Sequence, residues 1–355
     1  MAFTRLDTDD FVVSADSISA TLWSGGQPSL STFFTSSTQA AGSSGLYYLN
    51  IYQTSSTDAN AEVQFAIAYG NSAGSGSANY NSGVDGRSPT STIYGQYQNL
   101  VLGDENTDFV FGGITSDEFF ALPVERARYK EKIFLQSQTL CIRNGINQIQ
   151  VTDNSAYVTS VVFNEAGRVF QLISGSQGVR TSSPKDGDGL GYSANDGSYG
   201  WLLPDIGTIL LNPSAFSCSF ALGGVDLEFS GSEFNGSLSY NTSDNANATL
   251  YSAISASGVQ NNAVPFRLNS EETITSDFIF VRPRTSAYNY SENPSFISGS
   301  TGEIIFSSFI NNPQTFITTV GLYNDTNELL AVAKLSRPLV KDFTKEALIR
   351  VKLDF

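Results

Sequence analysis

Short apolar runs of strand length recur along this chain, separated by segments rich in Gly, Ser, Asn and Asp. Residues 46–52, 63–69 and 169–173 are runs of this kind. Apolar or alternating runs bounded by turn residues are typical of strands, whereas an amphipathic helix needs a longer 3.6-residue period. Phe and Tyr are abundant, at 25 and 16 residues, and both favour pleated surfaces. The sequence therefore predicts a mainly β protein: two or three antiparallel β-sandwich-like domains with long Gly/Ser/Asn-rich loops and at most one or two short helices.

The C-terminal part carries the clearest strand signals. Residues 347–355 alternate, with an apolar side chain at every odd position and Arg350, Lys352 and Asp354 between them. The sequence Asn-Asp-Thr-Asn at 324–327 predicts a hairpin turn. This turn would join strands at 316–323 and 329–335, and two further strands are predicted at 273–281 and 304–309.

The distribution of these elements predicts three domains. Residues 1–135 form an N-terminal β domain, residues 136–215 form a β-meander domain or an insertion, and residues 216–355 form a C-terminal β domain. The last of these ends in the hairpin and the terminal strand.

Two features of the first two domains are specific enough to test. A long polar loop at 70–91 is expected either to contact a partner or to be flexible. A short helix is predicted near 124–134, because proline suits a first helical turn and an acidic residue favours its positive end. Strands at 146–152, 157–163 and 169–173, separated by turn residues, predict the meander.

The net charge of −15 limits the partners that are expected. An acidic surface repels phosphate groups, so neither nucleic acid nor an anionic membrane is an expected partner. The segment 334–352 differs, because it holds six basic residues and two acidic ones. This local basic bias predicts either a docking patch for an acidic neighbour or a solvated strand face.

The chain contains no histidine, which excludes the Ser-His-Asp and Cys-His nucleophile systems and every zinc site that uses imidazole. Cys141 and Cys218 are far apart in sequence, and we expect free thiols made in a reducing cytoplasm. A phosphate-binding Gly-x-x-x-x-Gly-Lys motif is also missing. We therefore expect a protein that is not an enzyme, with no catalytic, cofactor-binding or metal-binding residues and no cofactor.

Three weaker signals leave alternatives open. The 34 acidic residues include enough carboxylates for the pair that a glycosidase requires, although a sequence cannot pair them. Asp186 and Asp188 resemble the start of a calcium-binding loop, but the twelfth position holds Gly197 instead of an acid, which favours a solvated turn. Five tyrosines predict either a sugar-binding platform or, more simply, core and cross-strand pairs; they are Tyr47, Tyr48, Tyr52, Tyr94 and Tyr97.

Several segments resemble virion structural proteins of T-even-like contractile-tailed phages, especially phages of marine cyanobacteria. Residues 316–334, with Leu-Tyr-Asn-Asp followed by Leu-Leu-Ala-Val, and the Pro-Leu-x-Lys element at 338–341 are similar to a hairpin of tail-fibre and baseplate proteins. The resemblance extends to 94–97, 102–106, 126–130 and 347–355.

This resemblance implies a structural component of the virion, most simply in the tail or baseplate or at a tail-fibre attachment. Its partners would be other tail or baseplate proteins, with the chain as a homo-oligomer or in many symmetric copies. It would be made in the cytoplasm of the bacterial host. Two alternatives are kept: a receptor-binding or polysaccharide-depolymerising tail fibre or spike protein, and a capsid decoration protein.

Overall fold

The computed structural model describes residues 6, 8–32, 34–42, 45–74, 88–181, 199–218, 224–225, 246–261, 264–291 and 293–354. Strands make up 46% and helices 15% of the structure, which confirms the predicted mainly β class. Four α-helices lie in the described ranges, where at most two were expected: α1 (Pro89–Tyr97), α2 (Arg126–Tyr129), α3 (Pro213–Ser217) and α4 (Ala246–Asn261). A π-helical turn, Gln98–Leu102, follows α1 directly.

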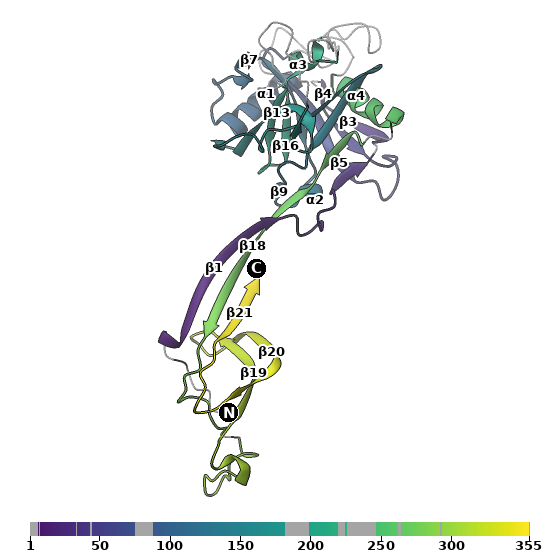
Figure 1. Cartoon of the computed structure of the whole chain (residues 1–355). Coiled ribbons are helices and arrows are strands. Elements are labelled where there is room, and N and C mark those ends of the chain that lie inside the picture. Colours follow the sequence, from purple (N-terminus) through teal and green to yellow (C-terminus); the bar gives the residue numbers. More distant parts are fainter. Residues whose placement is uncertain are drawn as a thin grey trace. The chain divides into compact units, whose positions relative to one another are not determined.

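The chain forms two compact units (Figure 1). Unit 1 comprises Met1–Ser19 and Thr273–Phe355, and unit 2 comprises Ala20–Glu272. The predicted boundaries at 135 and 215 are wrong, because β8 (Glu118–Pro123) pairs with β16 (Thr208–Leu211), and β10 (Thr139–Asn144) pairs with β17 (Phe266–Leu268). Strand pairing between distant segments, which local patterns do not reveal, therefore joins the three predicted domains.

Unit 2 is built on one large antiparallel sheet whose strands run in the order β2-β17-β10-β11-β13-β15-β16-β8-β5-β4-β3. The short strands β12 and β14 also pair with β13. The remaining bounds are β2 (Leu30–Thr32), β3 (Ser36–Gly42), β4 (Gly45–Tyr52), β5 (Val63–Asn71), β11 (Asn147–Asp153), β12 (Val162–Asn164), β13 (Gly167–Ser176), β14 (Val179–Arg180) and β15 (Gly200–Leu203). A separate hairpin joins β6 (Phe109–Phe111) to β7 (Ile114–Ser116). β9 (Lys132–Ile133) pairs with Ser270 and Glu271, the first residues of β18 (Ser270–Val281), which belong to unit 2.

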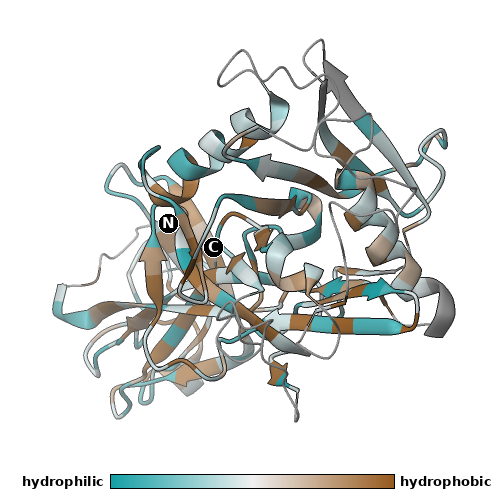
Figure 2. Cartoon of the chain, turned by 90° about the horizontal axis from the view of Figure 1, so that it is seen from above, coloured by the Kyte–Doolittle hydropathy of each residue, from teal (hydrophilic) through white to brown (hydrophobic). Residues whose placement is uncertain are grey.

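The central strands of this sheet are buried on both faces. In β8, Phe120 and Leu122 belong to one hydrophobic cluster, while Phe119 and Ala121, which alternate with them along the strand, belong to another. Because successive side chains of a strand point to opposite faces, the two clusters lie on opposite sides of the sheet. The first cluster includes α4 and the second includes α1. Apolar residues, brown in Figure 2, lie mainly on the strands.

The sheet also curls so that its distant strands face each other. Phe65 on β5 and Phe266 on β17 are seven strands apart in the sheet order, yet their ring centroids are 5.1 Å apart. Phe34 packs edge-on against the same Phe65 ring at 4.9 Å. The first cluster is thus enclosed between two parts of one sheet, which is the sandwich-like packing that the sequence predicted.

Helix α4 was missed because small residues obscure its pattern. Leu250, Ala253, Ile254 and Ser257 are all buried and follow the i, i+3, i+4, i+7 spacing of a core-facing helix. Only two of these four are large apolar residues, so the segment reads as polar. The spacing itself was the signal that would have identified the helix.

Several local predictions have mixed outcomes. The helix near 124–134 exists but is only four residues long, Arg126–Tyr129. Most of the loop at 70–91 lies outside the described residues, and its ends belong to β5 and α1. Of the three strands predicted for the meander, those at 146–152 and 169–173 correspond to β11 and β13, which pair with each other. Only Val162 and Phe163 of the predicted strand at 157–163 belong to a strand, β12.

Unit 1 contains a sheet in the order β1-β18-β21, made of β1 (Phe11–Ala20), β18 (Ser270–Val281) and β21 (Ile349–Asp354). It also contains the hairpin of β19 (Thr315–Tyr323) and β20 (Leu329–Lys341), as the sequence predicted. The predicted strand at 304–309 is wrong, since this segment has one bridge and a 3-10 turn, Ser307–Phe309. A second 3-10 turn, Thr8–Asp10, precedes β1.

Candidate assembly surface

The two units differ sharply in how they place their apolar side chains. Of the fifty buried apolar residues in the described ranges, forty-seven lie in unit 2 and three in unit 1, namely Val281, Ile349 and Val351. Of the twenty-nine large apolar residues that are exposed in the described part of the chain, thirteen lie in unit 2 and sixteen in unit 1. A folded unit normally buries most of its large apolar side chains, and contiguous exposed patches mark interaction sites. Unit 1 is therefore the candidate assembly surface.

The two faces of the three-stranded sheet of unit 1 differ in character. Ile279 lies opposite Val351 and Val281 opposite Ile349, so these four side chains share one face. On the other face Phe278 lies opposite Lys352, whose ammonium is 6.0 Å from the ring centroid, and the Arg350 guanidinium is 5.5 Å away. The alternation predicted for 347–355 is confirmed between Ile349 and Asp354.

Strand β1 forms one edge of this sheet and is exposed along nearly its whole length. Its Phe11, Val12 and Val13 side chains are exposed, although three such residues in a row would normally lie in a core. An edge strand with exposed apolar side chains is a ready site for pairing with another chain. The edge at β1 thus extends the apolar surface of unit 1.

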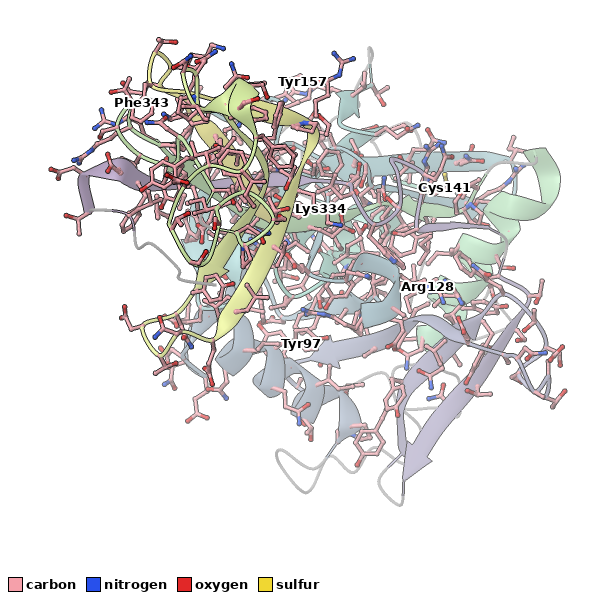
Figure 3. The ribbon with its side chains drawn as sticks, turned by 90° about the horizontal axis from the view of Figure 1, so that it is seen from below. Tyr97, Arg128, Cys141, Tyr157, Lys334 and Phe343 are labelled. Carbon is pink, nitrogen blue, oxygen red and sulfur yellow. The ribbon has the colours of Figure 1, made fainter. Side chains whose placement is uncertain are left out.

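The hairpin β19–β20 exposes one face almost completely. The pairs on that face are Thr319 with Lys334, Gly321 with Val332, and Tyr323 with Leu329, and all six residues are exposed. We call these six residues the outer hairpin face. Lys334 is labelled on the yellow strand β20 in Figure 3. The Tyr323 ring lies over Gly321, because a Cβ on this glycine would be 2.8 Å from the ring.

Tyr323, Leu329 and Val332 form the apolar part of the outer hairpin face, with 44%, 53% and 53% of their surface exposed. Leu330, at an irregularity in the strand pairing, is 68% exposed beside them. Isolated two-stranded hairpins are marginally stable in water. A hairpin that turns four large apolar side chains outward is consequently expected to gain much of its stability from a partner.

Hydrogen bonds define the conformation of the hairpin turn. Asn324 Oδ1 accepts hydrogen bonds from the backbone N–H groups of Thr326 and Glu328, at 3.1 and 2.7 Å. Its Nδ2 donates to Glu328 Oε2 at 2.7 Å, and Asn327 takes the left-handed conformation with φ +65°. Such side-chain-to-backbone bonds set the geometry of a turn and so present the neighbouring apolar residues in one arrangement.

Unit 1 is held together by polar contacts more than by a core. Lys341 is fully buried, and its Nζ donates to Asn289 Oδ1 at 2.6 Å, to the carbonyl oxygen of Asp342 at 3.0 Å and to that of Thr285 at 3.1 Å. Burial lowers the pKa of this amine, an effect that the charges of Asp342 and Glu346 oppose. These bonds fasten the end of β20 to the segment at 285–289.

Asp10 provides a second polar anchor. Its Oδ1 accepts from Arg284 Nε at 2.7 Å and from an Arg282 guanidinium nitrogen at 3.2 Å. Burial by itself would raise the pKa of Asp10, but the hydrogen bonds and charges of the two arginines lower it below its ordinary value. The start of β1 is thereby tied to the end of β18.

The basic segment at 334–352 does not act as one patch. Lys341 is buried, Lys345 pairs with Asp342 at 3.1 Å, and Lys352 pairs with Asp354 at 2.7 Å. The Thr344 hydroxyl and backbone N–H, with Lys345, lower the pKa of Asp342 to about 2. Part of the positive charge of the segment is therefore buried or paired with acidic residues of unit 1. This arrangement fits a solvated strand face better than a docking patch for an acidic neighbour.

The tyrosines that suggested a sugar platform do not come together as one. Tyr94 is buried and its hydroxyl donates to the Ser116 carbonyl oxygen at 2.9 Å. Tyr94 and Tyr97 both pack on Phe119, at ring-centroid distances of 5.4 Å. Tyr48 on β4 is instead 43% exposed. The interpretation as core side chains therefore holds for Tyr94 and Tyr97.

Two acids of unit 2, the partly buried Asp205 and the buried Asp153, have structural partners. Asp205 accepts from the Arg168 side chain at 2.9 Å and from its backbone N–H at 2.7 Å, which outweighs the effect of burial and lowers the pKa of Asp205. Asp153 accepts from Gln136 N at 3.0 Å and Ser155 N at 3.2 Å, but burial dominates and raises its pKa. Both carboxylates fix loops beside β13.

Other site predictions are tested only in part. Asp186, Asp188 and Gly197 lie outside the described residues. Within the described ranges no group of three or more potential ligand side chains is placed to hold a metal ion. Cys141 (Figure 3) and Cys218 are both buried. Among the helices that the structure describes, none has the length and apolar character required to cross a membrane.

Comparison with known proteins adds no family to this description. No family model, no curated protein and no solved structure matches the chain.

Proposed function

We propose that this chain is a non-enzymatic structural component of a tailed-bacteriophage virion, in the tail or baseplate, and that it acts through protein–protein contacts made by unit 1. The observation that carries the proposal is the contrast, among the described residues of unit 1, between sixteen exposed and three buried large apolar side chains. A unit with so small a core is stabilised by association, because conformational entropy opposes its folding and little apolar burial offsets it.

The phage setting is supported by the position of the resemblance. The segment that is similar to a hairpin of tail-fibre and baseplate proteins, 316–334, coincides with β19 and the exposed part of β20. The residues that carry the likeness thus include Tyr323, Leu329 and Val332, which form the apolar part of the outer hairpin face. A shared surface segment of this kind fits a shared mode of assembly.

The difference in packing between the two units supports the same proposal. Unit 2 has a continuous core on both faces of its sheet and supplies a stable body. Unit 1 supplies an exposed edge strand and an exposed hairpin, which are the means by which sheet proteins join neighbours. On this proposal the chain works in the virion with other tail or baseplate proteins, without nucleic acid or membrane contacts.

The proposal is tested by mass spectrometry of virions purified from the phage that encodes this chain. We expect the chain in intact particles and in the tail fraction after tails are separated from heads. Virions that lack the protein, or that carry it only on heads, would refute a tail or baseplate position.

A matched pair of variants tests the role of unit 1. Val332→Asp, on the outer hairpin face, is expected to exclude the chain from particles. Val179→Asp, at a 66% exposed position on β14 of unit 2, is expected to leave incorporation unchanged. Equal incorporation of the two variants would contradict an assembly role for this hairpin.

A further inference from the structure

The outer hairpin face requires an occupant. Its three apolar side chains are 44% to 53% exposed, and Leu330 beside them is 68% exposed. They lie on a two-stranded sheet with which no other strand of the described residues pairs. A contiguous exposed apolar patch on an ordered hairpin is typical of an interface.

Charge distinguishes this region from the remainder of the chain. Residues 273–355 hold eight basic and eight acidic residues, so their formal charges cancel, whereas residues 20–272 hold ten basic and twenty-two acidic residues. Two copies of a chain with net charge −15 repel each other. The neutral C-terminal region is where two copies approach with the least repulsion.

The hairpin is also self-complementary in charge. Asp325 and Glu328 lie at its turn, and Lys334 lies on the outer hairpin face beyond the apolar side chains. When two such hairpins pack face to face in opposite directions, each acidic turn approaches the Lys334 end of the other. The apolar side chains of both copies are then buried at the centre, as in an isologous two-fold interface.

We propose that a second copy of this chain packs on the outer hairpin face, so that the protein is a homo-oligomer joined through β19–β20. The inference deepens the proposed function, on which it rests for the role of unit 1, by naming the partner. Copies of one chain are present together at synthesis, and an exposed hairpin is stabilised as soon as two copies meet.

The first test is the molar mass of the purified full-length chain at micromolar concentration, measured by light scattering during size-exclusion chromatography. We expect a multiple of the single-chain mass. Val332→Glu would bury an unpaired charge at the interface, and we expect the dissociation constant to rise at least roughly 100-fold. Ile146→Glu, at a 91% exposed position of unit 2, is the matched control and should leave the mass unchanged.

The second test is a cysteine cross-link. A residue close to a two-fold axis faces its own counterpart, so Val332→Cys is expected to give a disulfide-linked dimer on a non-reducing gel. The background is low because Cys141 and Cys218 are both buried. Ile146→Cys is the control and should stay monomeric on the gel.

The outcomes separate the two proposals. A monomeric wild-type chain, or equal cross-linking of the Val332→Cys and Ile146→Cys variants, overturns the homo-oligomer. If such a monomer is nevertheless present in purified tails, the proposed function stands and the outer hairpin face belongs to a different tail protein. A homo-oligomer that is absent from virions would refute the proposed function alone.

Discussion

Gly70 and Phe119 offer a direct test of how the body of the protein is packed. They are cross-strand partners on β5 and β8, and a Cβ on Gly70 would be 2.8 Å from Cζ of the Phe119 ring. The ring is fully buried against Tyr94, Tyr97 and Phe109, at centroid distances of 5.4, 5.4 and 4.8 Å. The Phe119 ring therefore occupies the space that a side chain at position 70 would need.

The free energies of unfolding follow from this geometry. Phe119→Ala removes a fully buried ring and is expected to cost about 4 kcal/mol. Gly70→Ala places a methyl group against the ring and is expected to cost about 2 kcal/mol, since overpacking forces side chains to shift. In the double variant the methyl group enters the space that the ring has left. We expect a total cost of about 4 kcal/mol, which is a coupling of about 2 kcal/mol between the sites.

The assay is equilibrium unfolding in urea followed by tryptophan fluorescence. Trp201 reports on this cluster because its ring lies 5.2 Å from that of Phe111, and Trp23→Phe removes the other, half-exposed tryptophan. Phe163→Ala, at a 69% exposed position, is the matched control and should cost less than about 0.5 kcal/mol.

Two results would refute this account. If the single-variant costs add in the double variant within about 0.5 kcal/mol, the glycine does not make room for the ring. If Phe119→Ala costs less than about 1 kcal/mol, the cluster does not stabilise unit 2.

Three further predictions follow from individual contacts. Thr344→Val should raise the pKa of Asp342 from about 2 toward its ordinary 3.8, as measured by carbon NMR titration. The stabilising contacts of the Asp342 carboxylate would then be lost at a higher pH during acidification than in the unaltered protein. An unchanged pKa would contradict this prediction. Burial raises the pKa values of Tyr94 and Tyr97 to about 12, so the stability that they contribute is complete below pH 10 and lost as the pH rises to 12; absorbance titration should show both ionising only with unfolding. Gly200→Ala should lower the melting temperature of unit 2, because φ is +134° and the new Cβ would be 1.9 Å from a backbone oxygen; an unchanged melting curve would show that the strand yields.

The strands at the C-terminal end were predictable because their signals are local. The alternation at Ile349–Asp354 and the turn residues at 324–327 are signals that depend only on residues close together in the sequence. Both the alternating strand and the turn are present in the structure. Helix α4 was not predicted because Ala and Ser fill much of its buried stripe. The strand predicted at 157–163 was mostly wrong because Tyr157 is held instead by a contact with β14, accepting from Arg180 N at 2.9 Å.

The assembly surface could not be located from the sequence. Leu329 and Leu330 are the same residue type as Leu210 and Leu211, and only the structure shows the first pair exposed and the second buried. Exposure depends on which elements cover a strand, and no pattern within the strand encodes that. The basic bias at 334–352 was visible in the sequence, but the burial of Lys341 and the pairing of Lys345 were not.

By itself the sequence determined the β class, the terminal hairpin and the lack of histidine chemistry, because each depends on residue type or on short-range periodicity. Only the tertiary structure decided that Met1–Ser19 joins Thr273–Phe355 in one unit, and that the long sheet of the other unit has a hydrophobic cluster on each face. Strand pairing across hundreds of residues is selected by the packing of the whole chain, since every strand offers the same backbone hydrogen bonds. The same packing leaves the hairpin β19–β20 exposed, and this exposure carries the functional proposal.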